Sequence, residues 1–166
     1  MASTKPTRSQ ASPTRRRADA ARKIYDPEST YSADDKQQIA GRITGIYRAL
    51  PRFYVGVVFQ EVPRTSSFAG GEPVSDFVRI WVDHIARSFD NDDLKSRFLE
   101  AVGQLLGPFF RDRGLRWEMH VDETPFSHWT IEGLRPPLPE TDAETRWRTE
   151  NRPTPYLRYR RVEVRG

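Results

Sequence analysis

The feature of this sequence that most constrains its fold is a strand–helix–strand pattern that occurs twice. In the first copy, residues 23–25 form a short predicted strand, and a helix begins after Ser32, which can cap it together with Asp35. Pro51 ends this helix, and residues 53–62 form a second predicted strand whose nearly continuous apolar character predicts burial on both faces. One apolar stripe at helical spacing runs along the helix: Ile39, Ile43, Ile46, Tyr47 and Leu50.

The second copy follows a predicted loop over residues 63–75. Residues 77–86 are predicted as a strand, and Asn91 caps a helix over residues 92–112. Gly114 stands just past the end of that helix, and residues 115–121 form the closing strand. The helix has the strongest amphipathic stripe of the chain: Leu94, Phe98, Ala101, Val102, Leu105, Leu106, Phe109 and Phe110.

Two such units in tandem predict an α/β (α+β) fold with mainly parallel strands. Each unit spans roughly forty residues, which suits a right-handed crossover between parallel strands. We place the first unit at residues 22–62 and the second at residues 76–121. Helices on one face leave the other face of the sheet uncovered, and we expect oligomerisation to cover it.

A C-terminal packing segment over residues 122–157 completes a domain that we place at residues 22–157. Its prolines predict an extended stretch, and Thr141 with Glu144 predicts a capping box for a short helix. Three large side chains of this segment are expected to pack against the domain or a neighbouring subunit: Trp129, Trp147 and Tyr156.

Charge is distributed unevenly along the chain, which has 27 basic and 23 acidic residues. Residues 1–23 contain seven of the basic residues and one acidic residue, Asp19. The remainder therefore has 20 basic and 22 acidic residues and is slightly acidic. Because nucleic-acid-binding domains normally present a basic face on the fold itself, we do not expect nucleic acid to be a partner.

Both ends of the chain are polar and basic. We expect residues 1–21 to be a disordered basic extension, because they have almost nothing apolar to bury, and residues 158–166 to be a basic tail. The absence of cysteine suits a reducing compartment, and no apolar run suits a membrane span or a secretory signal. We therefore expect a soluble cytoplasmic protein. The extension also has the composition of an organelle transit peptide, and a solvated tail or a misplaced start codon are the alternatives.

The end of the first strand in the second unit is one candidate for a ligand site. His84 lies in that strand and Arg87 follows it. Ligands favour the carboxyl ends of strands in parallel α/β sheets, and an arginine there can bind a small carboxylate with two hydrogen bonds. A surface salt bridge from Arg87 to Asp90 or Asp92 is the alternative.

The closing strand ends in a second cluster of polar residues. His120 is followed by Asp122 and Glu123, and general acid–base chemistry needs such groups close together. The alternative is a polar strand end that runs into a turn at Pro125. A lone histidine on a strand is more often a structural group. Nothing in the sequence has the spacing of a phosphate loop or a metal site, and we expect no cofactor and no metal.

An ordered series of short motifs runs along the chain: Ile24-Tyr25, Ile43-Thr44 with Tyr47, Phe53-Tyr54-Val55, His84-Ile85-Ala86-Arg87, Asn91-Asp92-Asp93, Trp117-Glu118, His120 to Pro125, Gly133-Leu134 with Pro136-Pro137, and Glu150-Asn151-Arg152-Pro153. This series resembles the fungal oxalocrotonate tautomerase-like proteins of the tautomerase superfamily, which are similar to cis-3-chloroacrylic acid dehalogenase. The resemblance covers roughly residues 22–157 and implies a tautomerase fold and a homotrimer.

The resemblance also implies site residues. An N-terminal proline serves that family as acid or base, and its position here falls on or near Ala20. Arg87 matches a carboxylate-binding arginine, whereas the second such arginine matches Asp90. Tyr47 matches an active-site histidine and His120 a tyrosine that activates water.

The remaining implied residue, a glutamate, falls on Ile131 or, with one inserted residue, on Glu132. The resemblance therefore implies His120, Tyr47 and Glu132 as catalytic candidates and Arg87 as a substrate-binding candidate. We add His84 as a second substrate-binding candidate, because it lies in the strand that Arg87 follows. Because Asp90 would repel a carboxylate, we do not expect dehalogenation.

Three functions remain open from the sequence. The first is a tautomerase-like isomerase or hydratase that acts on a small 2-oxo or unsaturated carboxylic acid. The second is a non-catalytic family member that keeps the fold and a carboxylate pocket. The third is a binder of nucleic acid or an anionic surface through the basic extension, which the slightly acidic domain does not favour.

Overall fold

A computed structural model describes residues 20–89 and 91–157 of the chain, and it confirms the two tandem β-α-β units. The first unit consists of β1 (Ala20–Pro27), α1 (Ala33–Ile46) and β2 (Gly56–Val62). The second consists of β5 (Phe77–His84), α2 (Asp92–Arg111) and β6 (Arg116–Glu123). The shorter elements are η1 (Arg52–Tyr54), η2 (Arg64–Ser66), β3 (Phe68–Ala69), β4 (Glu72–Pro73), η3 (Phe126–His128) and α3 (Asp142–Glu150).

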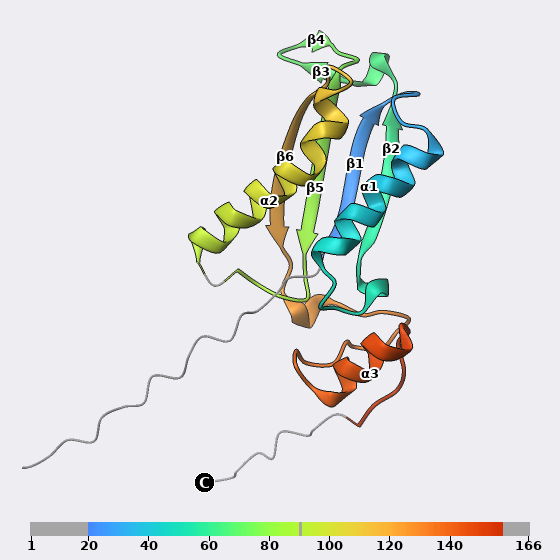
Figure 1. The fold of residues 1–166 in the computed structure, drawn as a ribbon, viewed down its shortest axis with the longest axis vertical. Coiled ribbons are helices and arrows are strands. Elements are labelled where there is room, and N and C mark those ends of the chain that lie inside the picture. The colour runs from blue at the N-terminus through green and yellow to red at the C-terminus, as the bar shows by residue number, and fades with distance from the viewer. Residues whose placement is uncertain (1–19, 90, 158–166) are drawn as a thin grey trace, which may run out of the picture.

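The four long strands form one mixed sheet in the order β2-β1-β5-β6. Each β-α-β unit contributes a parallel pair, and the two units meet where β1 runs antiparallel to β5. Both long helices lie on the same face of the sheet, as Figure 1 shows. The sheet therefore has one face covered by helices and one open face.

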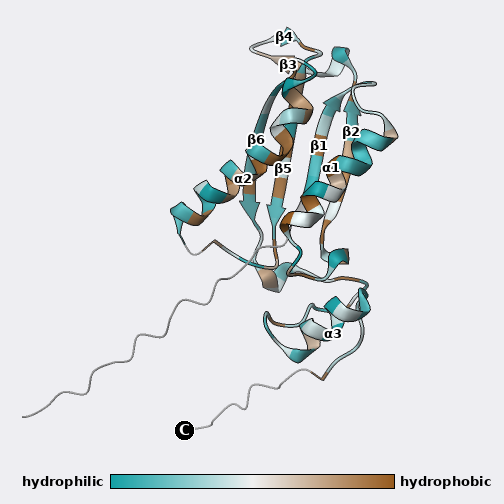
Figure 2. Cartoon of the chain, in the orientation of Figure 1, coloured by the Kyte–Doolittle hydropathy of each residue, from teal (hydrophilic) through white to brown (hydrophobic). Residues whose placement is uncertain are grey.

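The core lies between the helices and the covered face of the sheet. Alternate residues of β5 are buried there, namely Val78, Ile80 and Val82. Most residues of the predicted stripes supply the other side of this core, among them Ile39 and Ile43 from α1, whereas Leu94 and Ala101 of α2 are exposed. Hydrophobic segments of the strands lie beneath helices whose outward surfaces are largely hydrophilic (Figure 2).

Helix capping agrees with the sequence at α1 and in part at α3. Ser32 accepts a hydrogen bond from the Asp35 N–H, and the Asp35 carboxylate accepts one from the Ser32 N–H, which completes a capping box. Thr141 likewise accepts from the Glu144 N–H. The Glu144 carboxylate, however, does not return to Thr141, because it binds elsewhere.

The prediction that residues 53–62 form a strand buried on both faces is wrong in two respects. Residues 52–54 form the turn η1, and the strand begins only at Gly56. No residue of β2 is buried, and Val58 is 59% exposed. The physical reason is position, because β2 is an edge strand and one face of the sheet has no helix over it.

The C-terminal segment packs against the end of the sheet through aromatic side chains. Trp147 of α3 is fully buried, and its ring centroid lies 5.9 Å from that of Phe53 and 6.2 Å from that of Tyr54. Trp129 lies 4.7 Å from Tyr54, and Tyr156 lies 6.0 Å from Trp147. The expected contact between this segment and the domain is thus present within a single chain.

Most of the predicted basic extension (residues 1–19) and the predicted basic tail (residues 158–166) lie outside the described residues. Within the described part of the chain, no helix is both long enough and apolar enough to cross a membrane.

Candidate active site

Three polar side chains meet between the covered face of the sheet and the ends of the two long helices. Arg22 of β1 donates a hydrogen bond from its guanidinium to the hydroxyl oxygen of Tyr47. That oxygen lies 3.3 Å from Nε2 of His84, the last residue of β5. Arg22 is 1% exposed and His84 is fully buried. We call Arg22, Tyr47 and His84 the buried triad.

Local structure explains why these three residues meet. Side chains alternate along a strand, so Arg22 shares the covered face of β1 with buried Ile24. Tyr47 is the C-cap residue of α1 and lies above that face. His84 pairs in register with Ala20 at the beginning of β1. The buried triad therefore lies near the beginning of β1.

Aromatic rings surround the imidazole of His84. The Phe89 ring stacks on it, with centroids 4.4 Å apart and planes 11° apart. Phe98 of α2 lies 5.1 Å from His84, and the Arg22 guanidinium lies 5.9 Å from the Phe98 ring. Burial lowers the pKa of His84 to about 3, and the charge of Arg22 acts in the same direction while Glu123 opposes it. His84 is therefore neutral at physiological pH.

Glu123, at the end of β6, holds the segment that carries Phe89. The backbone N–H of Phe89 donates to Glu123 Oε1 over 2.8 Å, and Lys95 Nζ lies 3.1 Å from Glu123 Oε2. Burial alone would raise the pKa of Glu123, but the Phe89 N–H and Lys95 hold it below its usual value. Glu123 is thus an ionised anchor for the aromatic wall of the site.

Arg87, expected to bind a substrate carboxylate, is directed towards α3. Its Nη2 donates to Glu144 Oε1 over 2.7 Å, and its Nη1 donates to the carbonyl oxygen of Ala86 over 2.8 Å. Glu144 Oε2 also accepts a hydrogen bond from the Glu140 N–H over 2.7 Å. Arg87 and Glu144 are both buried, so in this chain the arginine ties the end of β5 to the C-terminal segment.

The structure brings Tyr47 and His84 together but leaves the other two catalytic candidates apart from them. His120 is exposed on the open face of the sheet, where its ring lies 5.0 Å from that of Trp81. Glu132 is exposed in a tight turn closed by Ile131 and Leu134, and it has a φ of 50°. Within one chain, neither side chain belongs to the buried triad.

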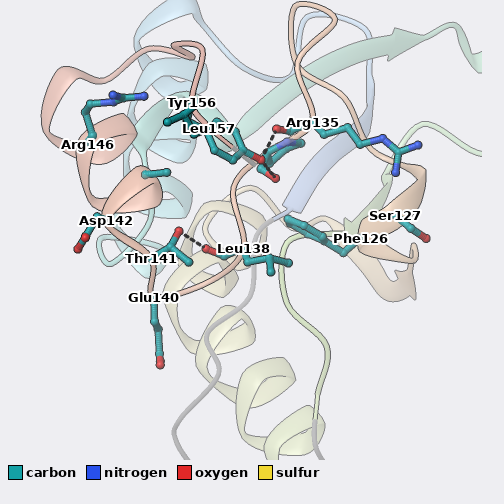
Figure 3. A pocket seen from close by; sticks show the side chains of 12 residues that line it. Phe126, Ser127, Arg135, Leu138, Glu140, Thr141, Asp142, Arg146, Tyr156 and Leu157 are labelled. Carbon is teal, nitrogen blue, oxygen red and sulfur yellow. Dashed lines mark hydrogen bonds between the residues drawn. The ribbon is translucent and has the colours of Figure 1, made fainter. Parts of the chain in front are cut away.

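A separate groove of about 1220 Å³ lies on the C-terminal segment (Figure 3). Its lining combines apolar side chains, among them Phe126, Leu138 and Tyr156, with Arg135 and Arg146. No member of the buried triad lines it. Across residues 20–89 and 91–157, no three His, Cys, Asp or Glu side chains gather as metal ligands would.

Comparison with known proteins identifies the family of this chain. The family described as "Putative oxalocrotonate tautomerase enzyme" matches residues 21–152. The chain belongs to this family, within the tautomerase superfamily. No curated protein matches the sequence.

Two proteins of solved structure share substantial sequence with this chain. RhCC from Rhodococcus jostii RHA1 is 42% identical, with a TM-score of 0.79, over 82% of this chain and 99% of that chain. A probable enzyme from the thermophilic fungus Aspergillus fumigatus is 34% identical, with a TM-score of 0.79, over 84% of this chain and 99% of that chain. The second likeness agrees with the fungal resemblance noted from the motifs.

More distant structures agree in fold alone. N1, a member of the cis-3-chloroacrylic acid dehalogenase family, is 20% identical with a TM-score of 0.62, over 79% of this chain and 97% of that one. A fused 4-OT, solved as an asymmetric trimer, is 16% identical with a TM-score of 0.58, over 69% and 94%. The predicted tautomerase fold is confirmed.

Several residues around the site were not among the sequence candidates, namely Arg22, Phe89, Phe98 and Glu144. Arg22 was counted with the basic extension, because its charge resembles that of the residues before it. The period-two alternation with Ile24 is the signal that could have placed it on the covered face. Phe89 follows β5 outside any periodic pattern, and nothing in the sequence indicates that it stacks on His84.

Proposed function

We propose that this protein is a tautomerase-like isomerase or hydratase that acts on a small 2-oxo or unsaturated carboxylic acid. The observation that carries the proposal is the buried triad. It brings a buried cation, a phenol and a neutral imidazole together near the beginning of β1. Family membership supports the reaction class, and the triad supports an anionic substrate.

Arg22 is the residue that we propose for binding the substrate carboxylate. Its guanidinium is buried and adjoins the Tyr47 hydroxyl, and a desolvated guanidinium binds a carboxylate more strongly than an exposed one does. Arg87 is a weaker choice than the sequence suggested, because its guanidinium already binds Glu144. A carboxylate would have to displace that acid to reach Arg87.

We propose that the acid–base chemistry of this site differs from that of a proline enzyme. The resemblance puts the family's proline on or near Ala20, and the residue at that position is not proline. In the proposed reaction Tyr47 and His84 bind the enol or carbonyl oxygen while water delivers the proton to carbon or removes it. An amine base would require a chain that begins at this position, and its unperturbed pKa of about 8 would suit such a role.

The departure at Ala20 and the Arg87–Glu144 pair favour a second candidate function, that of a non-catalytic member. Such a protein would keep the fold and bind a carboxylate in the same place without turnover. The two candidates make the same prediction for binding and different predictions for rate.

We further propose that the protein is a homotrimer. The fused 4-OT structure is an asymmetric trimer, and the open face of this sheet carries a half-exposed Trp81 and an exposed Val58 that a neighbouring copy would cover. His120 would meet that neighbour, so it enters the proposed chemistry only through assembly. For Glu132 the family resemblance is the sole support.

The test is ketonisation of phenylenolpyruvate, followed by the loss of enol absorbance, with the full chain at a fixed concentration. We expect a rate above that of buffer. We expect Arg22→Gln to reduce kcat/KM by about thirtyfold or more, because losing a buried charge contact costs about 2 kcal/mol or more. Arg97→Gln removes the same charge from the exposed face of α2 and is the matched control.

The outcomes separate the two candidates. Binding of phenylpyruvate that Arg22→Gln abolishes, without turnover by the wild type, identifies the non-catalytic member. Equal rates for Arg22→Gln and Arg97→Gln, with the fold of both intact by circular dichroism, would exclude Arg22 from the site.

A further inference from the structure

We infer that Phe89 is a gate whose ring leaves His84 before an anionic ligand reaches the buried triad, and that Glu123 holds this gate closed. The inference rests on the proposed function, because it concerns access to the same site. It assigns the control of ligand entry to a residue that contacts the imidazole and is itself no part of the triad.

The buried triad has almost no contact with solvent when the protein is in this conformation. Arg22 is 1% exposed, Tyr47 is 4% exposed and His84 is fully buried. A ligand that binds among these groups exchanges contacts with water for contacts with the protein, so it needs a path from the surface. At least one of the surrounding side chains therefore moves when a ligand enters.

Phe89 lies between the imidazole of His84 and the surface. Its ring stacks on the imidazole, with centroids 4.4 Å apart and planes 11° apart. Phe89 is half-buried, whereas His84 beneath it is fully buried. Departure of the Phe89 ring would therefore expose one face of the imidazole.

Of the aromatic residues around His84, Phe89 has the backbone that is easiest to move. Phe98 belongs to α2, where helix hydrogen bonds hold its backbone, and Tyr47 is the buried C-cap residue of α1. Phe89 lies between the end of β5 and Asn91, the N-cap of α2, outside any helix or strand. Such segments open at a lower free energy than helices and core strands do, so we assign the movement to Phe89.

Glu123 holds Phe89 through its backbone. Glu123 pairs in register with His84, so β6 brings this carboxylate to the end of β5. The Phe89 N–H donates to Glu123 Oε1 over 2.8 Å, and Lys95 Nζ lies 3.1 Å from Glu123 Oε2. A hydrogen bond to an ionised acceptor is roughly twice as strong as one between neutral groups, so a neutral residue at this position would hold Phe89 less firmly.

The residues on either side of Phe89 limit how far it can travel. Two positions before it, Arg87 forms a buried ion pair with Glu144 at 2.7 Å. Two positions after it, the Asn91 side chain accepts a hydrogen bond from the Leu94 N–H at the start of α2. The gate is thus a local displacement of one residue, during which β5 and α2 keep their places.

Access to His84 is measured by its modification with diethyl pyrocarbonate at about pH 7.5, without any assay of turnover. The reagent acylates neutral imidazoles, and His84 is neutral at this pH. His128, exposed in η3, is the reference in each protein, and peptide mass spectrometry follows both rates. We expect His84 of the wild type to react about tenfold or more slowly than His128, because the reagent reaches it only when the gate is open.

Two substitutions open the gate by different means. Phe89→Ala removes the cover and should raise the modification rate of His84 by about tenfold or more. Phe68→Ala, which truncates an exposed phenylalanine of the β3–β4 hairpin, is its matched control and should leave the rate unchanged.

Glu123→Gln keeps the Phe89 ring but weakens its attachment, and should raise the rate of His84 by about threefold or more. Glu118→Gln removes an ion-paired carboxylate from the open face of the same strand and is the matched control. Circular dichroism checks that each variant keeps its fold.

Phenylpyruvate is the ligand probe, and stopped-flow fluorescence follows its binding. Because the gate opens before the ligand enters, the observed rate of binding to the wild type should level off at high phenylpyruvate concentration, at the rate of opening. With Phe89→Ala the observed rate should keep rising in proportion to the concentration.

A His84 that reacts as fast as His128 in the wild type would overturn the inference, and so would equal rates of His84 in Phe89→Ala and Phe68→Ala. Equal rates in Glu123→Gln and Glu118→Gln would overturn the role of Glu123. Binding to the wild type that stays proportional to phenylpyruvate concentration would show that no gate limits entry. A protein that shows the expected access to His84 but neither binds nor converts phenylpyruvate would refute the proposed function and leave the gate standing.

Discussion

Replacement of Asp26 by asparagine should stabilise this protein at neutral pH. Asp26 lies near the end of β1, is 1% exposed, and has no hydrogen-bond partner for either carboxylate oxygen among the described residues. Burial raises its pKa to about 6 from the ordinary 3.8, although Lys36 opposes the shift. Glu61 adds to it, since its like charge faces Asp26 across the β1–β2 pair.

The magnitude follows from the difference of about 2 pKa units, at about 1.4 kcal/mol for each unit, which gives about 3 kcal/mol. The folded state holds the Asp26 proton more tightly than the unfolded state does. Below about pH 4 both states are protonated and the carboxyl costs nothing. As the pH rises to about 6, the carboxyl of Asp26 loses its proton more readily in the unfolded state than in the folded state, so the free energy of unfolding falls. The stability that protonated Asp26 permits is therefore lost on the alkaline side.

The assay is urea unfolding of both proteins at about pH 4 and about pH 8, at one protein concentration because assembly also contributes to stability. Asp26→Asn should be more stable than the wild type by up to about 3 kcal/mol at the higher pH, and about equal to it at the lower pH. Glu100→Gln, on the exposed side of α2, removes the same charge and should change stability by less than about 0.5 kcal/mol. A stability difference for Asp26→Asn that does not depend on pH would refute the reasoning.

Three further predictions concern packing and assembly. Arg87→Ala should cost about 3–5 kcal/mol of unfolding free energy, because it leaves the Glu144 carboxylate buried without its partner. The double replacement of Arg87 and Glu144 by methionine should cost less. A loss near zero for Arg87→Ala, measured by urea unfolding, would contradict a structural role for this ion pair. Trp147→Ala should cost about 3–5 kcal/mol and increase proteolysis of the C-terminal segment, whereas unchanged proteolysis would show that the aromatic contacts do not hold that segment. Trp81→Glu on the open face should reduce the mass measured by sedimentation to that of a monomer, and an unchanged mass would place the interface elsewhere.

Part of the candidate site could be predicted from the sequence. Tyr47 was named through the resemblance and His84 from its place in a strand, and the structure places their side chains 3.3 Å apart. Arg87 was placed correctly at the end of a strand, but its partner was not, because Glu144 lies 57 residues further along the chain. A salt bridge between segments so distant in sequence depends on how the C-terminal segment docks, and no local pattern records it.

His120 and Arg22 also show what the sequence could not predict, namely which face of the sheet is buried. His120 pairs in register with Trp81 on the open face, whereas Arg22 lies on the covered face with Ile24. The alternation of side chains in a strand assigns residues to two faces but does not say which face the helices cover. Only the packing of α1 and α2 on one side decided that Arg22 is buried and His120 is exposed.

By itself, the sequence determined the order of the long strands and helices, the helix starts and the tandem β-α-β arrangement. Those properties depend on periodicity, capping and turn residues, which act over a few neighbouring positions. The tertiary structure decided that β2 is an exposed edge, that Arg87 binds Glu144, and that Arg22, Tyr47 and His84 meet. Each of these depends on contacts between distant segments, whose free energies arise only when the sheet and helices are assembled.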